Sequence, residues 1–398
     1  MLGPAFTAPT PSSIDSVLNP DTPTFSTERP TLFRERHGWC PYSERVWLTM
    51  ELIGMDYDTV RIDNTGGPRP SYYGGQTPQM KWPDGSKQGE SYDLVQALDE
   101  QYYNSKLQSS DKVQHYVDSF RSIFPRARPS SRAAFLFQYN GEPLSKSTFE
   151  ETLEQTNDLL ATTTDSGPFF AGSQVTAADI AWAPFLERYR YQLPCLHQGL
   201  EPDNPTEYPH LAAWFHAMEQ HVPSYACRVK GDASSWRKVL SMAGFGNSGV
   251  PPAIGTNMDA LTQAERETAL SCVKQDVWDE YAATRPYVAS TPSAEAAKII
   301  TQNRQRILQD LQKQQSYNRE AAVQLPDGSK ELDVVLRNLV HVLIQNGDTT
   351  SSMEGDPEMV GCLAAFLDER MCVPRDMGAM SAACIKDLAW KLSSENPK

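Results

Sequence analysis

The sequence predicts an α/β domain, then an all-helical domain, then a mainly helical C-terminal extension. Strand-like and helix-like patterns alternate over residues 31–103, whereas the patterns over 111–231 are almost all helical. A stretch rich in Gly, Pro and Ser at 244–256 separates these two domains from the helical patterns of residues 258–398. A chain of 398 residues is too long for one ordinary domain, so its length also favours a division.

The first 30 residues, MLGPAFTAPTPSSIDSVLNPDTPTFSTERP, are rich in Pro, Ser and Thr. They lack the apolar core that a secretory signal needs. Two interpretations of residues 1–30 stay open: a disordered leader, or the remnant of an organelle-targeting segment.

The α/β domain is expected over residues 31–103. TLFRER predicts a short strand, and a helical pattern of apolar residues follows from Pro41. YDTVRID alternates as a strand does, and two short extended pieces then flank a Pro-Asp-Gly turn, which indicates a hairpin. Ser91 is expected to cap the last helix of the domain. Parallel strands joined by a helix, followed by a hairpin and a covering helix, give the element order of a thioredoxin-like fold.

Residues 111–231 predict the all-helical domain. The segment STFEETLEQTNDLLATTT opens with a capping box, in which Ser147 or Thr148 caps the helix and Glu150 or Glu151 reaches back. This pattern predicts a helix that starts at the box.

A second capping box, formed by Thr176 and Asp179, precedes a long apolar run and predicts a buried helix in which the box is structural. The region 258–398 has no motif that indicates chemistry, and it could serve as a dimer contact, a lid on a substrate site or a shield for an apolar face. Its helical patterns are LTQAERETALSCVKQDVWDEY, SAEAAKIITQNRQRILQDLQKQQ and LDVVLRNLVHVLIQN.

Composition excludes several function classes. A net charge of −14 and a pI near 5.0 argue against nucleic acid or an anionic membrane as a partner. No apolar run approaches the roughly 20 residues of a membrane span. Seven scattered cysteines without a CxxC pair favour free thiols in a reducing compartment. The histidines at positions 210, 216 and 221 do not share one helical face, so no metal site is expected.

Cys40 lies directly before Pro41, where a strand pattern gives way to a helix pattern. The unpaired N–H groups of a first helical turn favour negative charge, so a thiol placed there is expected to be held as a thiolate. Proline suits the first helical position because its missing N–H is not needed there. The hydroxyls of Tyr42 and Ser43 could add hydrogen bonds to the sulfur. The alternative is a buried and inert cysteine, but the sequence around Cys40 favours a reactive one.

Two stretches of the chain resemble a known family. WCPYSERVWLTMELIGMDYDTVRID, followed by TPQMKWPDGSKQGES, resembles the N-terminal domain of cysteine-type glutathione transferases, which include the omega, lambda and dehydroascorbate reductase groups. GPFFAGSQVTAADIAWAPFLERY resembles the buried helix of their C-terminal domain. The resemblance covers roughly residues 31–231. The Trp before the cysteine and the long C-terminal extension are most similar to the iota class of photosynthetic organisms.

The resemblance implies a glutathione site in the N-terminal domain. Cys40 would form a mixed disulfide with glutathione. Thr77, before a cis-proline at Pro78, would pair its backbone with the cysteinyl part of glutathione. Glu90 would meet the γ-glutamyl ammonium group, and Ser91, at a helix start, would bind the γ-glutamyl carboxylate.

Other positions are less determined by the resemblance. Arg69 falls where the omega group carries a lysine, and it either pairs with the glycyl carboxylate of glutathione or is a solvated charge. Ser43 stands where iota members more often have a second cysteine, which implies a monothiol cycle. The acceptor site would lie near Trp39. Aromatic residues of the helical domain either line that site or belong to the core: Phe120, Phe124, Tyr189 and Tyr191.

These features predict a glutathione-dependent thiol transferase or reductase, acting in deglutathionylation, dehydroascorbate-type reduction or the reduction of quinone adducts. The alternative is a non-catalytic binding or scaffold protein with the same fold. Glutathione is the expected co-substrate, no metal is expected, and the acceptor would be a disulfide or an electrophile. A homodimer and a location in the plastid or the cytoplasm are compatible with this prediction.

Overall fold

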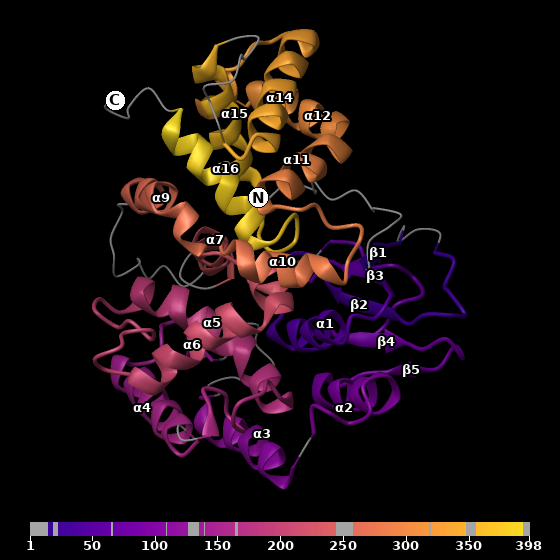
Figure 1. The fold of residues 1–398 in the computed structure, drawn as a ribbon, viewed down its shortest axis with the longest axis vertical. Helices are drawn as coiled ribbons and strands as arrows, with labels where there is room; N and C mark the ends of the chain where they lie inside the picture. The colour runs from indigo at the N-terminus through magenta and orange to yellow at the C-terminus, as the bar shows by residue number, and fades with distance from the viewer. Residues whose placement is uncertain are drawn as a thin grey trace. The chain divides into compact units, whose positions relative to one another are not determined.

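A computed structural model describes residues 15–18, 23–64, 67–108, 110–125, 135–138, 140–163, 166–243, 258–317, 320–347 and 356–392. They form two compact units (Figure 1). The first comprises the described residues between 15 and 225, together with 231–243. The second comprises residues 226–230 and the described residues from 258 to 392.

The first unit begins with a mixed sheet and two helices, as the α/β prediction requires. Among the described residues the strands lie in the order β1-β3-β2-β4-β5, with β1 and β2 parallel to β3, β4 antiparallel to β2, and β5 antiparallel to β4. The helix α1 joins β2 to β3, and α2 follows β5 and packs against α1. The predicted thioredoxin-like domain is therefore confirmed. Its elements are β1 (Asp15–Val17), β2 (Thr31–Glu35), α1 (Pro41–Ile53), β3 (Tyr57–Ile62), β4 (Gln79–Lys81), β5 (Lys87–Gln88) and α2 (Ser91–Tyr102).

The strand β1 was not predicted, because residues 1–30 were interpreted as a leader outside the fold. Asp15–Val17 pairs in parallel with β3, and Phe25 packs against Phe33 and Tyr72 with ring centroids 6.0 and 5.6 Å apart. The disordered-leader interpretation therefore does not hold for residues 15–18 and 23–30, which belong to the first unit, whereas the targeting interpretation stays a prediction. The other residues of this segment lie outside the described ranges. A three-residue strand paired with a distant segment leaves no periodic pattern of its own.

The second half of this unit is helical, as predicted. The buried helix α5 begins with the expected box: Asp179 accepts hydrogen bonds from the Thr176 N–H at 2.8 Å and from the Thr176 hydroxyl at 3.0 Å. The first predicted box is wrong by two residues, because the cap of α4 is Ser145, whose hydroxyl accepts from the Thr148 N–H at 3.2 Å. The helices are α3 (Asp111–Ile123), α4 (Lys146–Ala161), α5 (Ala177–Leu196), α6 (Pro209–His221) and α7 (Ala233–Ala243).

The second unit is helical in its described part, which confirms the predicted extension. The long pattern predicted over 293–315 is broken at Asn303, whose side chain donates to the Ile299 carbonyl oxygen at 2.8 Å and whose backbone ends one helix and begins the next. Residues 225–229 form a π-helix, and Ala226 and Cys227 of this segment pack against Trp278. The remaining elements are α9 (Met258–Glu267), a 3₁₀-helix (Ala269–Cys272), α10 (Gln275–Ala283), α11 (Pro292–Gln302), α12 (Arg304–Gln315), α13 (Glu320–Val323), α14 (Ser329–Ile344), α15 (Pro357–Arg370) and α16 (Ala379–Lys391).

Candidate active site

Cys40 occupies the N-cap position of α1, in extended conformation, with Pro41 as the first helical residue. The Glu44 N–H closes the first helical turn on the Cys40 carbonyl oxygen at 3.1 Å, so the N–H groups of Tyr42 and Ser43 have no partner within the helix. The Cys40 side chain is half-buried, and its thiol donates to the Thr77 carbonyl oxygen at 3.6 Å. The sulfur therefore lies at a helix start and is not enclosed in the apolar core.

Thr77 reaches Cys40 from the loop before β4. The Thr77–Pro78 peptide bond is cis, as the resemblance implied. The Thr77 hydroxyl accepts a hydrogen bond from the Asn64 side chain at 2.8 Å. The structure thus brings together the predicted nucleophile and the backbone predicted to pair with glutathione.

Arg69 organises the loop between β3 and Thr77. Its guanidinium donates to the carbonyl oxygens of Gly75 at 3.0 Å and Asp63 at 3.4 Å, and to the Asn64 side chain at 2.9 Å. The side chain is exposed. Both open interpretations of Arg69 omitted this role, because a pattern of local residues does not show which carbonyls a loop turns inward.

Glu90 and Ser91 lie at the start of α2, on a cavity of about 310 Å³. Glu90 has a φ of +60° and a ψ of 111°, a conformation that is strained for a residue with a side chain. The helix begins at Ser91, so the prediction of Ser91 as the cap is wrong. Its hydroxyl lies instead inside the first turn, 3.5 Å from a nitrogen of Arg45.

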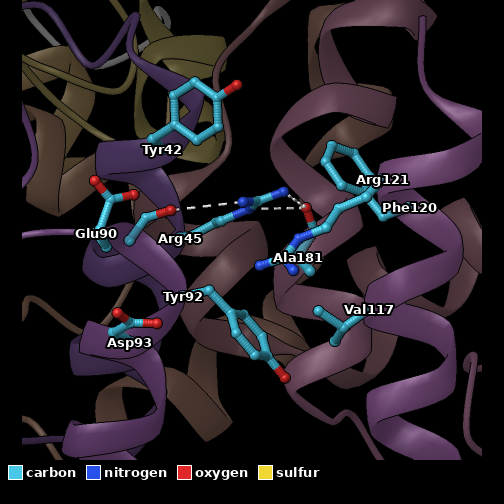
Figure 2. A pocket seen from close by; sticks show the side chains of 10 residues that line it. Tyr42, Arg45, Glu90, Tyr92, Asp93, Val117, Phe120, Arg121 and Ala181 are labelled. Atoms are coloured by element: carbon cyan, nitrogen blue, oxygen red, sulfur yellow. Dashed lines mark hydrogen bonds between the residues drawn. The ribbon is translucent and has the colours of Figure 1, made fainter.

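Arg45 lines this cavity and extends from α1 toward Ala181 (Figure 2). From α1 it donates to the Ala181 carbonyl oxygen on α5 at 2.9 and 2.7 Å, and its guanidinium lies over the Phe120 ring at 4.6 Å. The buried Arg45 thus ties the α/β domain to the helical domain beneath Ser91. The cavity is lined by Tyr42, Arg45, Glu90, Ser91, Tyr92, Asp93, Val117, Phe120, Arg121 and Ala181.

The described contacts bring neither Tyr42 nor Ser43 to the Cys40 sulfur. The Tyr42 ring packs edge-on against Phe185, with ring centroids 5.5 Å apart, and it is partly exposed to the cavity. Ser43 is buried, and its hydroxyl has no hydrogen-bond partner among the described residues.

Two of the four aromatic residues considered for the acceptor site belong to the core alone. Phe124 and Tyr189 are buried and pack together, with ring centroids 4.8 Å apart. Phe120 is also buried but lines the cavity, whereas Tyr191 is half-buried beside Arg190. The core interpretation is therefore correct for Phe124 and Tyr189, because their rings fill the space between helices.

A buried carboxylate at the end of β2 shapes the turn that leads to Cys40. Glu35 accepts hydrogen bonds from the His37 N–H and Nδ1, both at 3.0 Å, and from the Trp39 N–H at 2.7 Å. Burial raises the pKa of Glu35, but the hydrogen bonds and charge of His37 outweigh it and hold the pKa below its usual range. The Trp39 ring stacks on His37 with centroids 4.3 Å apart. Sequence reasoning missed Glu35, because a glutamate at a strand end is typical of a surface charge.

A second buried cluster lies beside the same turn. Arg188 on α5 donates to Glu44 Oε2 at 2.7 Å, and Glu187, its neighbour in the chain, accepts from the Trp236 indole N–H at 2.8 Å. Burial, opposed by Arg188 and reinforced by the hydrogen-bonded carboxyl of Glu187, raises the pKa of Glu44 to about 8. Glu44 Oε1 and Glu187 Oε2 have no donor among the described residues when both groups are ionised. A protonated Glu44 carboxyl can donate a hydrogen bond to the carboxylate of Glu187.

In the described part of the chain, a cysteine precedes the first helix of a thioredoxin-like domain, and a helical domain follows. Residues 39–101 match the family described as glutathione S-transferase, N-terminal domain, and residues 132–217 match glutathione S-transferase, C-terminal domain. Residues 39–101 and 132–217 therefore carry the two glutathione S-transferase domains, and the relatives that follow are consistent with a transferase of the cysteine type.

The similar curated proteins include three from Arabidopsis thaliana. Glutathione S-transferase L3 is 27% identical over 197 residues, which cover 46% of this chain and 75% of that protein. Glutathione S-transferase L2, chloroplastic, is 27% identical over 201 residues, covering 46% and 60%. Glutathione S-transferase DHAR2 is 29% identical over 153 residues, covering 37% and 66%. Both family matches end before residue 218, so they leave the second unit without an assignment.

Two further findings concern the described residues only. None of their helices combines the length and the apolar character needed to cross a bilayer. No group of three or more His, Cys, Asp or Glu side chains among them is placed to hold a metal ion.

Proposed function

We propose that the protein is a glutathione-dependent thiol transferase that uses Cys40 in a monothiol cycle. The observation that supports this most strongly is the contact between the Cys40 thiol and the Thr77 carbonyl oxygen, at the start of α1 and before Pro78. A glutathione transferase domain with a half-buried cysteine at this position has a nucleophile within reach of the backbone that would hold glutathione. The N–H groups of the first turn stabilise the thiolate.

Glutathione would bind along the edge that Thr77 and α2 share. The Thr77 backbone would pair with the cysteinyl part, and Ser91 would bind the γ-glutamyl carboxylate with its hydroxyl and its N–H group. Arg45, behind Ser91, adds positive charge to this end of the cavity. Glu90 would accept from the γ-glutamyl ammonium group, and its strained φ of +60° fits a residue held for binding. Arg69 would act on the glycyl end, chiefly by holding the loop.

The reaction would proceed by two thiol–disulfide exchanges. In the first, the Cys40 thiolate attacks the glutathionyl sulfur of a mixed disulfide, the disulfide bond breaks, and the acceptor thiolate leaves and takes a proton from solvent. In the second, the thiolate of a free glutathione attacks the glutathionyl sulfur on Cys40, which releases glutathione disulfide and regenerates the Cys40 thiolate. Ser43 stands at the position of a resolving cysteine, so the second glutathione performs that step.

A pair of cysteine variants tests this function. Cys40→Ser should abolish thiol transfer from the mixed disulfide of glutathione and 2-mercaptoethanol, whereas Cys362→Ser, a half-buried thiol of α15, should leave the rate unchanged. Conjugation of glutathione to an electrophile should persist or rise in Cys40→Ser. Equal transfer rates in wild type and Cys40→Ser would show that another thiol carries the reaction. No transfer in wild type, and no protection of Cys40 from iodoacetamide by glutathione, would favour the scaffold alternative.

The acceptor, compartment and assembly are proposals of the same kind. Deglutathionylation and dehydroascorbate reduction are the acceptor reactions we propose first, because relatives include lambda and dehydroascorbate reductase proteins. A plastid location is favoured over the cytoplasm by the relative named chloroplastic. Comparing the two acceptors in steady-state assays, and the mass in solution by analytical ultracentrifugation, would test the acceptor and a homodimer.

A further inference from the structure

Arg188 connects the helical domain to both sides of Cys40. From α5 it donates to the carbonyl oxygens of Trp39 at 3.0 Å and Gly38 at 3.3 Å, the two residues before Cys40. It also donates to Glu44 at 2.7 Å, in the first turn after Cys40. Its side chain is 2% exposed. A single buried guanidinium therefore holds both the residues before Cys40 and the first turn of α1 after it.

The turn before Cys40 is held from two directions. Glu35 accepts from the N–H groups of His37 and Trp39, while Arg188 donates to the carbonyl oxygens of Gly38 and Trp39. With their carbonyl oxygens engaged by Arg188, the peptide groups of Gly38 and Trp39 are held in one orientation before Cys40. The planar, forked guanidinium is suited to several acceptors at once, which an ammonium group is not.

The Arg188 guanidinium is itself packed between an aromatic ring and two carboxyl groups. The Trp236 ring lies 4.1 Å from the guanidinium carbon, and Glu44 and Glu187 lie beside it. Tyr225 is another titratable group near this cluster. Burial raises the pKa of its phenol, and the charges of Glu187 and Glu44 add to the effect. Burial raises the pKa of Glu44 to about 8, so at neutral pH this carboxyl is protonated and adds no negative charge beside the start of α1.

We propose that Arg188 is a positioning residue for Cys40, which sets the reactivity of the thiolate without taking part in glutathione binding. The expected effect on thiol transfer rests on the proposed function. The expected effect on alkylation of Cys40 does not, because alkylation can be measured whether or not the protein transfers thiols. Removing Arg188 should therefore lower the rate constant for alkylation of Cys40 and kcat in thiol transfer, and leave the Michaelis constant for glutathione unchanged.

The test compares wild type with Arg188→Lys and with a double variant, Arg188→Met with Glu44→Gln, which removes both partners of the Arg188–Glu44 hydrogen bond. Arg190→Met is the matched control, since Arg190 lies on the same helix but pairs with Asp203 and Glu219. The readouts are the rate constant for alkylation of Cys40 by iodoacetamide, and kcat and KM in thiol transfer. Peptide mapping assigns the alkylated residue.

In the double variant the alkylation rate constant and kcat should each fall by roughly tenfold or more, with KM for glutathione within about twofold of wild type. Arg188→Lys should have an alkylation rate constant and kcat between those of the double variant and wild type. Arg190→Met should have the wild-type values of both. A folded double variant with a wild-type alkylation rate would overturn the proposal. If the double variant does not fold, Arg188→Lys decides, because a wild-type rate there would also overturn it. If wild type lacks transfer activity, the proposed function fails, while the alkylation comparison still tests Arg188.

Discussion

Replacing Glu44 with glutamine should change how the stability of the first unit depends on pH. The pKa of Glu44 is raised from 4.5 to about 8, chiefly by burial. The folded chain therefore holds a proton between pH 4.5 and 8 that the unfolded chain releases, and its free energy of unfolding falls as pH rises through this window. The stabilising contribution is complete below pH 4.5 and is lost by pH 8.

One proton corresponds to a slope of roughly 1 kcal/mol per pH unit, hence to a few kcal/mol across the window. The amide introduced by Glu44→Gln would mimic the protonated acid, because its oxygen still accepts from Arg188 and its nitrogen can donate to Glu187. Relative to wild type, Glu44→Gln should gain stability steadily from pH 5 to pH 8. The other titrating groups do not affect this difference, since both proteins carry them.

Denaturant unfolding at several pH values, followed by tryptophan fluorescence, measures this difference. Glu100→Gln on the exposed face of α2 is the control and should leave the slope unchanged. Equal slopes for wild type and Glu44→Gln, with equal m-values, would refute the raised pKa of Glu44.

Other substitutions separate binding from stability. Glu90→Gly should raise the free energy of unfolding by about 1 kcal/mol, because glycine relieves the strained φ, and should raise KM for glutathione. Thermal unfolding and steady-state kinetics check this, and a fall in stability would contradict the strain. Asp179→Ala should lower the free energy of unfolding by about 3 kcal/mol or more, since it leaves the N–H groups of Thr176, Phe170 and Trp214 unpaired in the core. A change below about 1 kcal/mol in denaturant unfolding would contradict this role of the box.

Local patterns were sufficient to predict much of the fold. Pro41 at a helix start, the turn between β4 and β5, and the box of Thr176 and Asp179 each specify their element through neighbouring residues. Errors arose where the signal was not local. The short strand β1 depends on pairing with β3, and the break at Asn303 interrupts a pattern whose periodicity continues on both sides.

The candidate site also contains residues that local motifs predict and one residue that they do not. Cys40, Thr77 and Pro78 could be located from motifs, because the motif itself forms the helix start and the loop beside it. Arg188 could not, since it acts on Cys40 across a domain boundary and nothing in its neighbourhood on α5 indicates which backbone it meets. Buried charge clusters of this kind become visible only when the packing of distant segments is known.

The proposed function requires Cys40 to be an accessible thiolate placed to exchange with glutathione. Incubating the intact protein with glutathione disulfide, followed by mass spectrometry and peptide mapping, measures this most directly. We expect one glutathionyl group per chain, on Cys40, which prior alkylation blocks and dithiothreitol removes. A folded protein whose Cys40 peptide stays unmodified, while other cysteines react, would contradict the claim.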